Sequence, residues 1–205
     1  MIRKLLSALA IGSSVVVAPS APPRADVSKI LPYVVPAEYL EYQGAGAKPQ
    51  TWPLGHGLHV VLVHDLGDLV GNVLPEELQA LGLTAEQAKK KAIENLQSLA
   101  KSGLIGQRRF DGPGNKPFVL FGGHWAAATC ILLPELFQMG VKNVGSEELC
   151  VCIPHREALL MFAKGDKAYR ASMLEMIRER ESDGRKPLTF ALFELTAAGI
   201  RELAP

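Results

Sequence analysis

Aromatic residues and net charge are both scarce in this sequence. Only 6% of the 205 residues are Phe, Trp or Tyr, and 22 basic residues nearly balance 21 acidic ones, which gives a formal charge of +1. Nucleic-acid-binding proteins present a basic surface, and those that bind single strands also stack bases on aromatic side chains. The composition therefore argues against nucleic acid as a partner.

The sequence also lacks the short motifs of common cofactor and metal enzymes. It has no P-loop, no GxGxxG fingerprint and no HExxH zinc motif. Internal repeats and low-complexity segments are absent as well. The sequence thus predicts neither a cofactor nor a metal ion, and a site has to be argued from less specific residues.

Cysteine is limited to three residues, Cys130, Cys150 and Cys152. The last two are separated by one residue in a predicted strand, so their side chains share a face and run parallel, which is poor geometry for a disulfide. Cys130 has two possible partners, and either pairing leaves one thiol over. We interpret all three as small buried hydrophobic residues.

No apolar run is long enough for a comfortable membrane span. The longest such run near the amino terminus covers residues 5–18, follows Arg3 and Lys4, and precedes small residues and prolines. This layout predicts an export signal over residues 1–20, cleaved before Ala21 and leaving no transmembrane span. The alternative is an amphipathic amino-terminal helix of a cytoplasmic protein.

The remaining length and the 48% hydrophobic content favour one domain. Residues 21–54 form a proline-rich lead-in with a short helix predicted at 38–42. The domain proper is predicted to cover residues 55–205.

The domain begins with a clear strand, turn and helix pattern. Residues 58–63 are β-branched or apolar and precede turn residues, which predicts a largely buried strand. A short helix is expected from Pro75 to about Gly82. Thr84 and Gln87 then form a capping-box pattern ahead of an amphipathic helix over 85–101.

Further strands and helices are predicted along the rest of the chain. Strands are expected at 107–110, 118–121, 148–154, 158–166 and 187–195. An apolar helix is expected within 125–140, kinked or divided by Pro134, and a capped helix after Asp166. Because hairpin connections dominate this order, the predicted fold is α+β, with an antiparallel or mixed sheet packed on one face by helices.

The helix after Asp166 has two distinct faces. Its predicted inward face comprises Tyr169, Met173, Met176 and Ile177. Its predicted solvent face comprises Arg170, Glu175, Arg178, Glu179 and Arg180.

Five segments carry a resemblance to a known family: 30–32, 60–70, 75–96, 132–137 and 152–166. Over roughly residues 30–195 the chain resembles the YtpQ-like family of uncharacterised bacterial proteins. The resemblance implies a single α+β domain, usually cytoplasmic, with no assigned activity, cofactor or site residue. It also implies a longer amino-terminal region, which the signal-like leader replaces in this chain.

Candidate catalytic residues lie at strand ends. His64, Asp65 and His155 supply an acid and bases for a hydrolase. A metal site would need His56, His59, His64 and Asp65, with His124 or His155 brought in by the fold, because one strand cannot gather three ligands.

Two further candidates are weaker still. A thiol–histidine pair of Cys150 or Cys152 with His155 lacks an oxyanion-hole signature. Arg108 and Arg109, beside a glycine-rich turn, suit either an anion site or a solvated edge strand.

The absence of converging catalytic groups beside a complete core favours a non-catalytic binding or interaction domain. Its expected partner is a protein or a component of the cell envelope, in keeping with export. The alternative function is a hydrolase that uses His64, Asp65 and His155.

Overall fold

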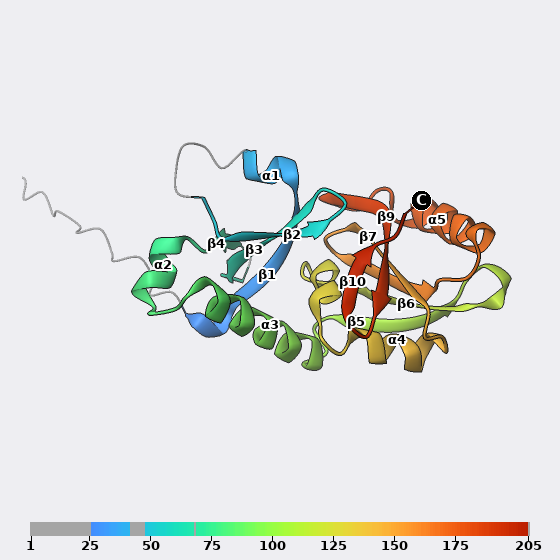
Figure 1. The fold of residues 1–205 in the computed structure, drawn as a ribbon, viewed down its shortest axis with the longest axis horizontal. Coiled ribbons are helices and arrows are strands. Elements are labelled where there is room, and N and C mark those ends of the chain that lie inside the picture. The colour runs from blue at the N-terminus through green and yellow to red at the C-terminus, as the bar shows by residue number, and fades with distance from the viewer. Residues whose placement is uncertain (1–25, 42–47, 68, 205) are drawn as a thin grey trace, which may run out of the picture.

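A computed structural model describes residues 26–41, 48–67 and 69–204. The predicted signal peptide at 1–20 and its cleavage point lie outside these residues. The described chain folds into two antiparallel sheets with helices packed against them, which confirms the predicted α+β class (Figure 1).

The smaller sheet is built mainly from the lead-in and the first predicted strand. Its order is β1 (Ile30–Pro36), β3 (Leu58–Asp65), β2 (Thr51–Gly55), and the short β4 (Val70–Asn72) also pairs with β3. Both β1 and β2 lie at edges of this sheet, where proline is tolerated because one side of the strand needs no ladder hydrogen bond. This explains why a proline-punctuated segment, expected as a lead-in, contributes strands.

The larger sheet has six antiparallel strands. They lie in the order β10 (Gly199–Glu202), β9 (Pro187–Thr196), β7 (Leu149–His155), β8 (Ala158–Ala163), β6 (Pro117–Gly122) and β5 (Gly106–Asp111). The hairpin predicted between residues 107 and 121 is confirmed as β5–β6.

Five α-helices and three short 3₁₀ helices complete the described chain. The α-helices are α1 (Ala37–Glu41), α2 (Pro75–Ala80), α3 (Ala85–Lys101), α4 (Leu136–Val144) and α5 (Lys167–Glu181). The 3₁₀ helices are η1 (Val27–Lys29), η2 (Pro113–Asn115) and η3 (Ala128–Leu132).

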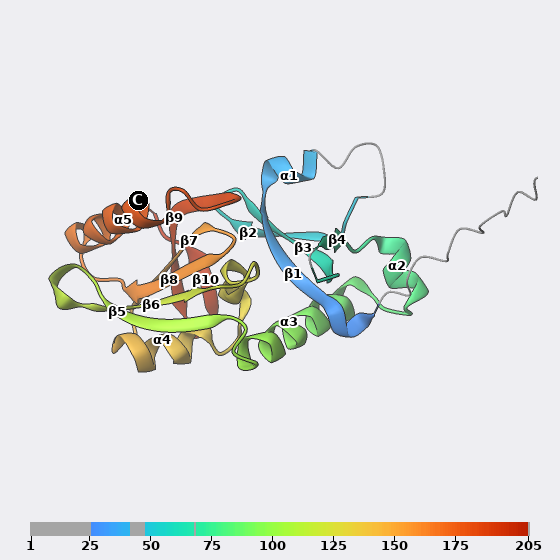
Figure 2. The same ribbon diagram turned by 180° about the vertical axis from the view of Figure 1, so that it is seen from behind.

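Helix α3 begins and ends as its sequence predicts. The Thr84 hydroxyl accepts from the Gln87 backbone N–H at 3.2 Å, and the Gln87 side chain accepts from the Thr84 N–H at 2.8 Å. The Asn95 side chain donates to the carbonyls of Val27 and Ile30, at 2.8 and 2.9 Å. These bonds hold α3 along β1, as seen from behind in Figure 2.

The apolar segment after residue 125 is divided at Pro134, as predicted. It forms η3 before the proline and α4 after it. Gly140 lets α4 approach the larger sheet closely, since a Cβ at this position would collide with the side chains of Leu149 and Met161. This helix is therefore fixed to the sheet by direct contact.

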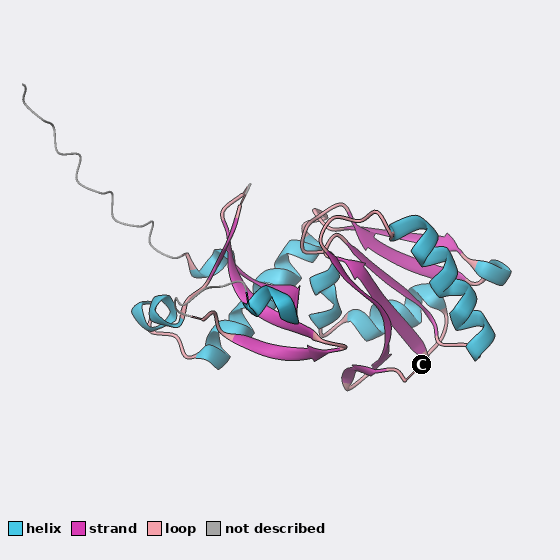
Figure 3. Ribbon diagram, turned by 90° about the horizontal axis from the view of Figure 1, so that it is seen from above, coloured by secondary structure: helices cyan, strands magenta, loops and turns pink. Residues whose placement is uncertain are grey.

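Both faces of the larger sheet are covered, whereas helices were predicted on one face of a single sheet. Leu149 and Val151 of β7 join the core shared with α4, η3 and the smaller sheet. Cys150 and Cys152, on the opposite face, pack with α5. All seven residues of β7 are consequently buried, and Figure 3 shows this sheet between its helices.

Helix α5 is capped by Asp166, whose carboxylate accepts from the Tyr169 backbone N–H at 2.8 Å. Three of its four predicted inward residues, Tyr169, Met173 and Ile177, are buried. Met176 is half-buried. The helix therefore presents the predicted stripe to the sheet.

Candidate functional site

The structure does not bring the predicted catalytic residues together. His64, on β3 of the smaller sheet, has its Nε2 atom 3.9 Å from the Glu77 carboxylate of α2. His155, at the end of β7 in the larger sheet, has its Nε2 atom 2.9 Å from the Glu181 carboxylate of α5. Figure 1 shows α2 and α5 at opposite ends of the molecule. His155 is thus hydrogen-bonded to its own carboxylate, whereas the buried Nε2 atom of His64 lies beyond hydrogen-bond distance of Glu77.

Asp65 has a turn-forming role. Its carboxylate accepts from the Gly67 backbone N–H at 3.0 Å, an arrangement typical of aspartate in turns. It also lies within electrostatic range of His124: burial lowers the pKa of His124, and the Asp65 charge opposes that shift. In the described ranges, no group of three or more His, Cys, Asp or Glu side chains is arranged to hold a metal ion.

The three cysteines are buried and unpaired with one another. Burial raises the pKa of Cys130 and Cys152 to about 12 and that of Cys150 to about 11. A catalytic thiol needs the opposite shift, because only the thiolate is nucleophilic. His155, the proposed base, is bonded to Glu181 instead.

A different part of the structure has the features of a ligand site. A cavity of about 520 Å³ lies between α5, β9 and the segment that follows β10. We name it the α5 cavity. It is lined by His56, Lys167, Arg170, Ala171, Leu174, Arg178, Phe190, Ala191, Leu192, Leu203 and Ala204.

The helical wall of this cavity is a stripe beside the buried stripe of α5. Residues 167, 170, 174 and 178 are spaced by three or four and residue 171 lies beside them, so all five share one side of the helix. The opposite wall comes from residues 190–192 of β9. Leu203 donates its backbone N–H to the Leu192 carbonyl at 2.9 Å, which holds the chain's last described residues against this wall.

The charges around the α5 cavity have one sign. Lys167, Arg170 and Arg178 line it, and none of the described lining residues is acidic. Arg170 donates to the Gly165 carbonyl at 2.9 Å, and the Arg178 guanidinium lies 5.6 Å from the centre of the Phe190 ring. These contacts hold the two guanidinium groups beside an apolar wall.

His56 closes one side of the cavity and is firmly held. Its Nε2 donates to the Leu192 carbonyl at 2.8 Å, and its ring packs edge-on against Phe193 with the centroids 4.8 Å apart. Its backbone N–H also donates to the Glu202 carboxylate. His56, which was weighed as a metal-ligand candidate, therefore joins the β2–β3 turn to the larger sheet.

Sequence reasoning missed this cavity for a physical reason. Arg170 and Arg178 were expected to face water, and the half-buried Leu174 was not assigned to a face. The available signal in the sequence was the spacing of Lys167, Arg170, Leu174 and Arg178 by three or four residues along the helix. It did not reveal the opposite wall, because β9 and the residues after β10 are close to α5 only through the fold.

The described helices include none that is long and apolar enough to cross a membrane. Searches of the chain against protein-family models, curated proteins and solved structures found no match. The resemblance to the YtpQ-like family therefore stays a prediction from sequence.

Proposed function

We propose that this protein is a non-catalytic binding domain, and that its α5 cavity holds a ligand with an apolar body and one anionic group. The observation that carries the proposal is an apolar cavity of about 520 Å³ with three cationic side chains and no described acidic residue around it. This volume lies within the range of about 300–1,000 Å³ that is typical of small-molecule sites.

The cations supply the attraction for the anionic group. A carboxylate or phosphate near Lys167 and Arg170 replaces part of its hydration by charge-assisted hydrogen bonds, which are stronger than bonds between neutral groups. Lys167 and Arg170 also lie in the first turn of α5, where the helix dipole favours a negative charge. The anionic group is therefore expected at this end of the cavity.

The apolar wall supplies the attraction for the ligand's body. Leu174, Phe190 and Leu192 line the space away from the first turn of α5. Each buried methylene group contributes about 0.8 kcal/mol, or about a fourfold gain in affinity. Affinity for a series of straight-chain carboxylates should rise by this factor per carbon and level off when the cavity is full.

The test uses a dansyl-labelled undecanoic acid, whose fluorescence rises in apolar surroundings. Ala171→Trp places a large ring in the α5 cavity, while Ala168→Trp places the same ring elsewhere on the exposed surface of α5. We expect Ala171→Trp to abolish the fluorescence rise and Ala168→Trp to retain it. Equal binding by both variants would overturn the proposal.

The charge requirement is tested separately. Lys167→Gln combined with Arg170→Gln should weaken binding of the probe by about tenfold or more, because each substitution removes a charge from the end of the cavity where the anionic group is expected. Lys90→Gln combined with Arg180→Gln is the matched control, since both residues are exposed and neither lines the cavity. An equal loss in the control would show that general surface charge, and not the cavity, attracts the probe.

We further propose that this domain works in the cell envelope, with an envelope component as its partner. Residues 1–20 support this, because a basic start followed by a short apolar run is the pattern of an export signal. The intact mass of the protein from fractionated native cells tests it. A chain that begins near Ala21 in the envelope fraction is the expected result, and a full-length chain in the cytoplasm would contradict it.

A further inference from the structure

The outer edge of β5 is a second surface with a defined chemistry. β5 is the last strand of the larger sheet on its side, and no strand of the described chain pairs with its outer edge. All six of its residues, Gly106–Asp111, are exposed. Unpaired backbone N–H and C=O groups along such an edge are a template for another strand.

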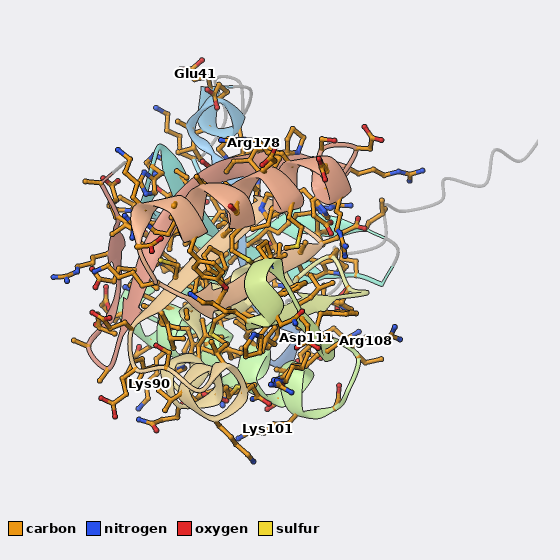
Figure 4. The ribbon with its side chains drawn as sticks, turned by 90° about the vertical axis from the view of Figure 1, so that its right-hand side faces the viewer. Glu41, Lys90, Lys101, Arg108, Asp111 and Arg178 are labelled. Atoms are coloured by element: carbon orange, nitrogen blue, oxygen red, sulfur yellow. The ribbon has the colours of Figure 1, made fainter. Side chains whose placement is uncertain are left out.

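This edge carries one arginine on each face of the sheet, and its one acidic residue, Asp111, lies at the end of the strand. Arg109 lies opposite Val119, a residue of the core shared with α4, and Arg108 lies opposite Leu120, which packs on the α5 side. Because directly opposite residues point to the same face, the two arginines project to opposite faces. Figure 4 shows Arg108 at the periphery of the molecule, well away from Arg178 on α5.

A hollow beside Arg109 extends the basic surface. It is lined by Gln107, Arg109, Met139, Lys142 and Asn143. The Arg109 Nε atom donates to the Asn143 carbonyl at 3.0 Å, which orients the guanidinium and leaves its other donors for a ligand. Lys142 adds a second positive charge, and no described acidic residue lines the hollow.

A second copy of this chain is a poor occupant of the edge. Antiparallel pairing of β5 with itself must join residues of the same face, so the two registers with most pairs are centred on Arg108 or on Arg109. Each register places an arginine directly opposite its own copy, and like charges in that position destabilise a sheet. The β5 edge therefore disfavours pairing with a second copy of itself and favours a strand that carries negative charge.

We propose that the β5 edge binds an extended acidic segment of a partner protein, which adds as a seventh strand to the larger sheet. Two consecutive acidic residues of the segment lie opposite Arg108 and Arg109, one on each face. A β-branched residue beside them packs on Phe110, whose ring is partly exposed and stacks on Phe118. Backbone hydrogen bonds supply affinity, and the paired acids supply specificity.

The probe is a fluorescein-labelled peptide, Thr-Val-Glu-Glu-Val-Thr, with Thr-Val-Lys-Lys-Val-Thr as its control. We expect the glutamate peptide to bind the full chain at least tenfold more tightly than the lysine peptide. Amide hydrogen exchange should slow across residues 106–111 when the glutamate peptide is added. Binding that leaves these amides unprotected would overturn strand addition, as would equal binding of the two peptides.

Charge reversal provides the second arm. Arg108→Glu with Arg109→Glu should weaken the glutamate peptide at least tenfold and strengthen the lysine peptide. Lys90→Glu with Arg180→Glu changes the net charge equally at exposed positions outside the β5 edge and should leave the preference unchanged. If single-stranded oligonucleotide displaces the glutamate peptide as well as unlabelled peptide does, the surface recognises negative charge alone and the proposal fails. The two peptides are compared on the unaltered chain, so this comparison does not depend on whether a variant folds.

Discussion

The two faces of the larger sheet are covered by helices in different ways. On one face α4 lies so close that Gly140 has no space for a Cβ between Leu149 and Met161. On the other face α5 packs through Tyr169, Met173 and Ile177, while its neighbouring stripe stands off from β9 and leaves the α5 cavity. A helix that contacts a sheet directly stabilises the fold, and one that leaves lined space beside it can hold a ligand.

The stabilising role and the ligand-binding role can be tested separately by substituting two neighbouring residues of α5. Met173→Ala removes a fully buried side chain and should lower the free energy of unfolding by about 2–5 kcal/mol. Leu174→Ala trims a half-buried cavity wall, so it should cost less stability and weaken binding of the undecanoic acid probe. Urea unfolding and probe titration of both variants measure the two effects. If Leu174→Ala destabilised the protein as much as Met173→Ala, the two stripes would not have different roles.

The close approach of α4 gives the next largest effect. Gly140→Ala forces a methyl group against Leu149 and Met161, and overpacking of this kind costs about 1–3 kcal/mol. Gly71→Ala is the matched control, because its added Cβ would meet nothing closer than 3.7 Å, the side chain of Leu66. Thermal unfolding should show a lower midpoint for the first variant alone. An unchanged midpoint for Gly140→Ala would contradict direct contact of α4 with the sheet.

Elements governed by local chemistry could be predicted from the sequence. The capping box at Thr84 and the break at Pro134 act within a few residues, and the structure has both where they were expected. β1 was missed because Pro32 indicated irregular chain, although an edge strand tolerates proline. The four-residue β10 was not predicted as a strand, and its pairing with β9 defines it.

The candidate site was much less predictable than the fold. His64 and His155 were chosen because they end strands, but the fold places them in different sheets, and only His155 is hydrogen-bonded to a glutamate. The α5 cavity depends on distant segments, since His56 reaches Leu192 across the fold. Arg170 and Arg178 had the composition of a solvent face, and only the opposite wall makes them part of a cavity.

Glu194, an acidic residue on the α5 side of the larger sheet, is already paired with two cations of its own. It lies opposite Cys150 on β9. Hydrogen bonds from Arg201, at 2.7 Å, and from Lys164, at 2.9 Å, lower the pKa of its carboxyl group to about 2. It therefore does not compete with a ligand for Lys167, Arg170 and Arg178.

This ion pair predicts a modest pH dependence of stability. A carboxyl group with a lowered pKa in the folded state stabilises the fold above its unfolded pKa of about 4.3, and this contribution disappears as the pH falls towards 2. Glu194→Gln should therefore be less stable than the parent at pH 7, with the difference shrinking between about pH 5 and pH 2. Urea unfolding across this range measures it, with Glu179→Gln on the exposed side of α5 as control. A difference that stays constant with pH would show that Glu194 contributes through packing alone.

The most direct test of the α5 cavity compares two amphiphiles that share a chain and differ in charge. Undecanoate and decyltrimethylammonium both carry a decyl chain, so burial of that chain in the cavity contributes equally to both. Calorimetric titration of the full chain should give an affinity for undecanoate at least tenfold higher, with the preference lost in the Lys167→Gln, Arg170→Gln variant. Equal affinities, or tighter binding of the cation, would contradict a cavity built for an anionic amphiphile.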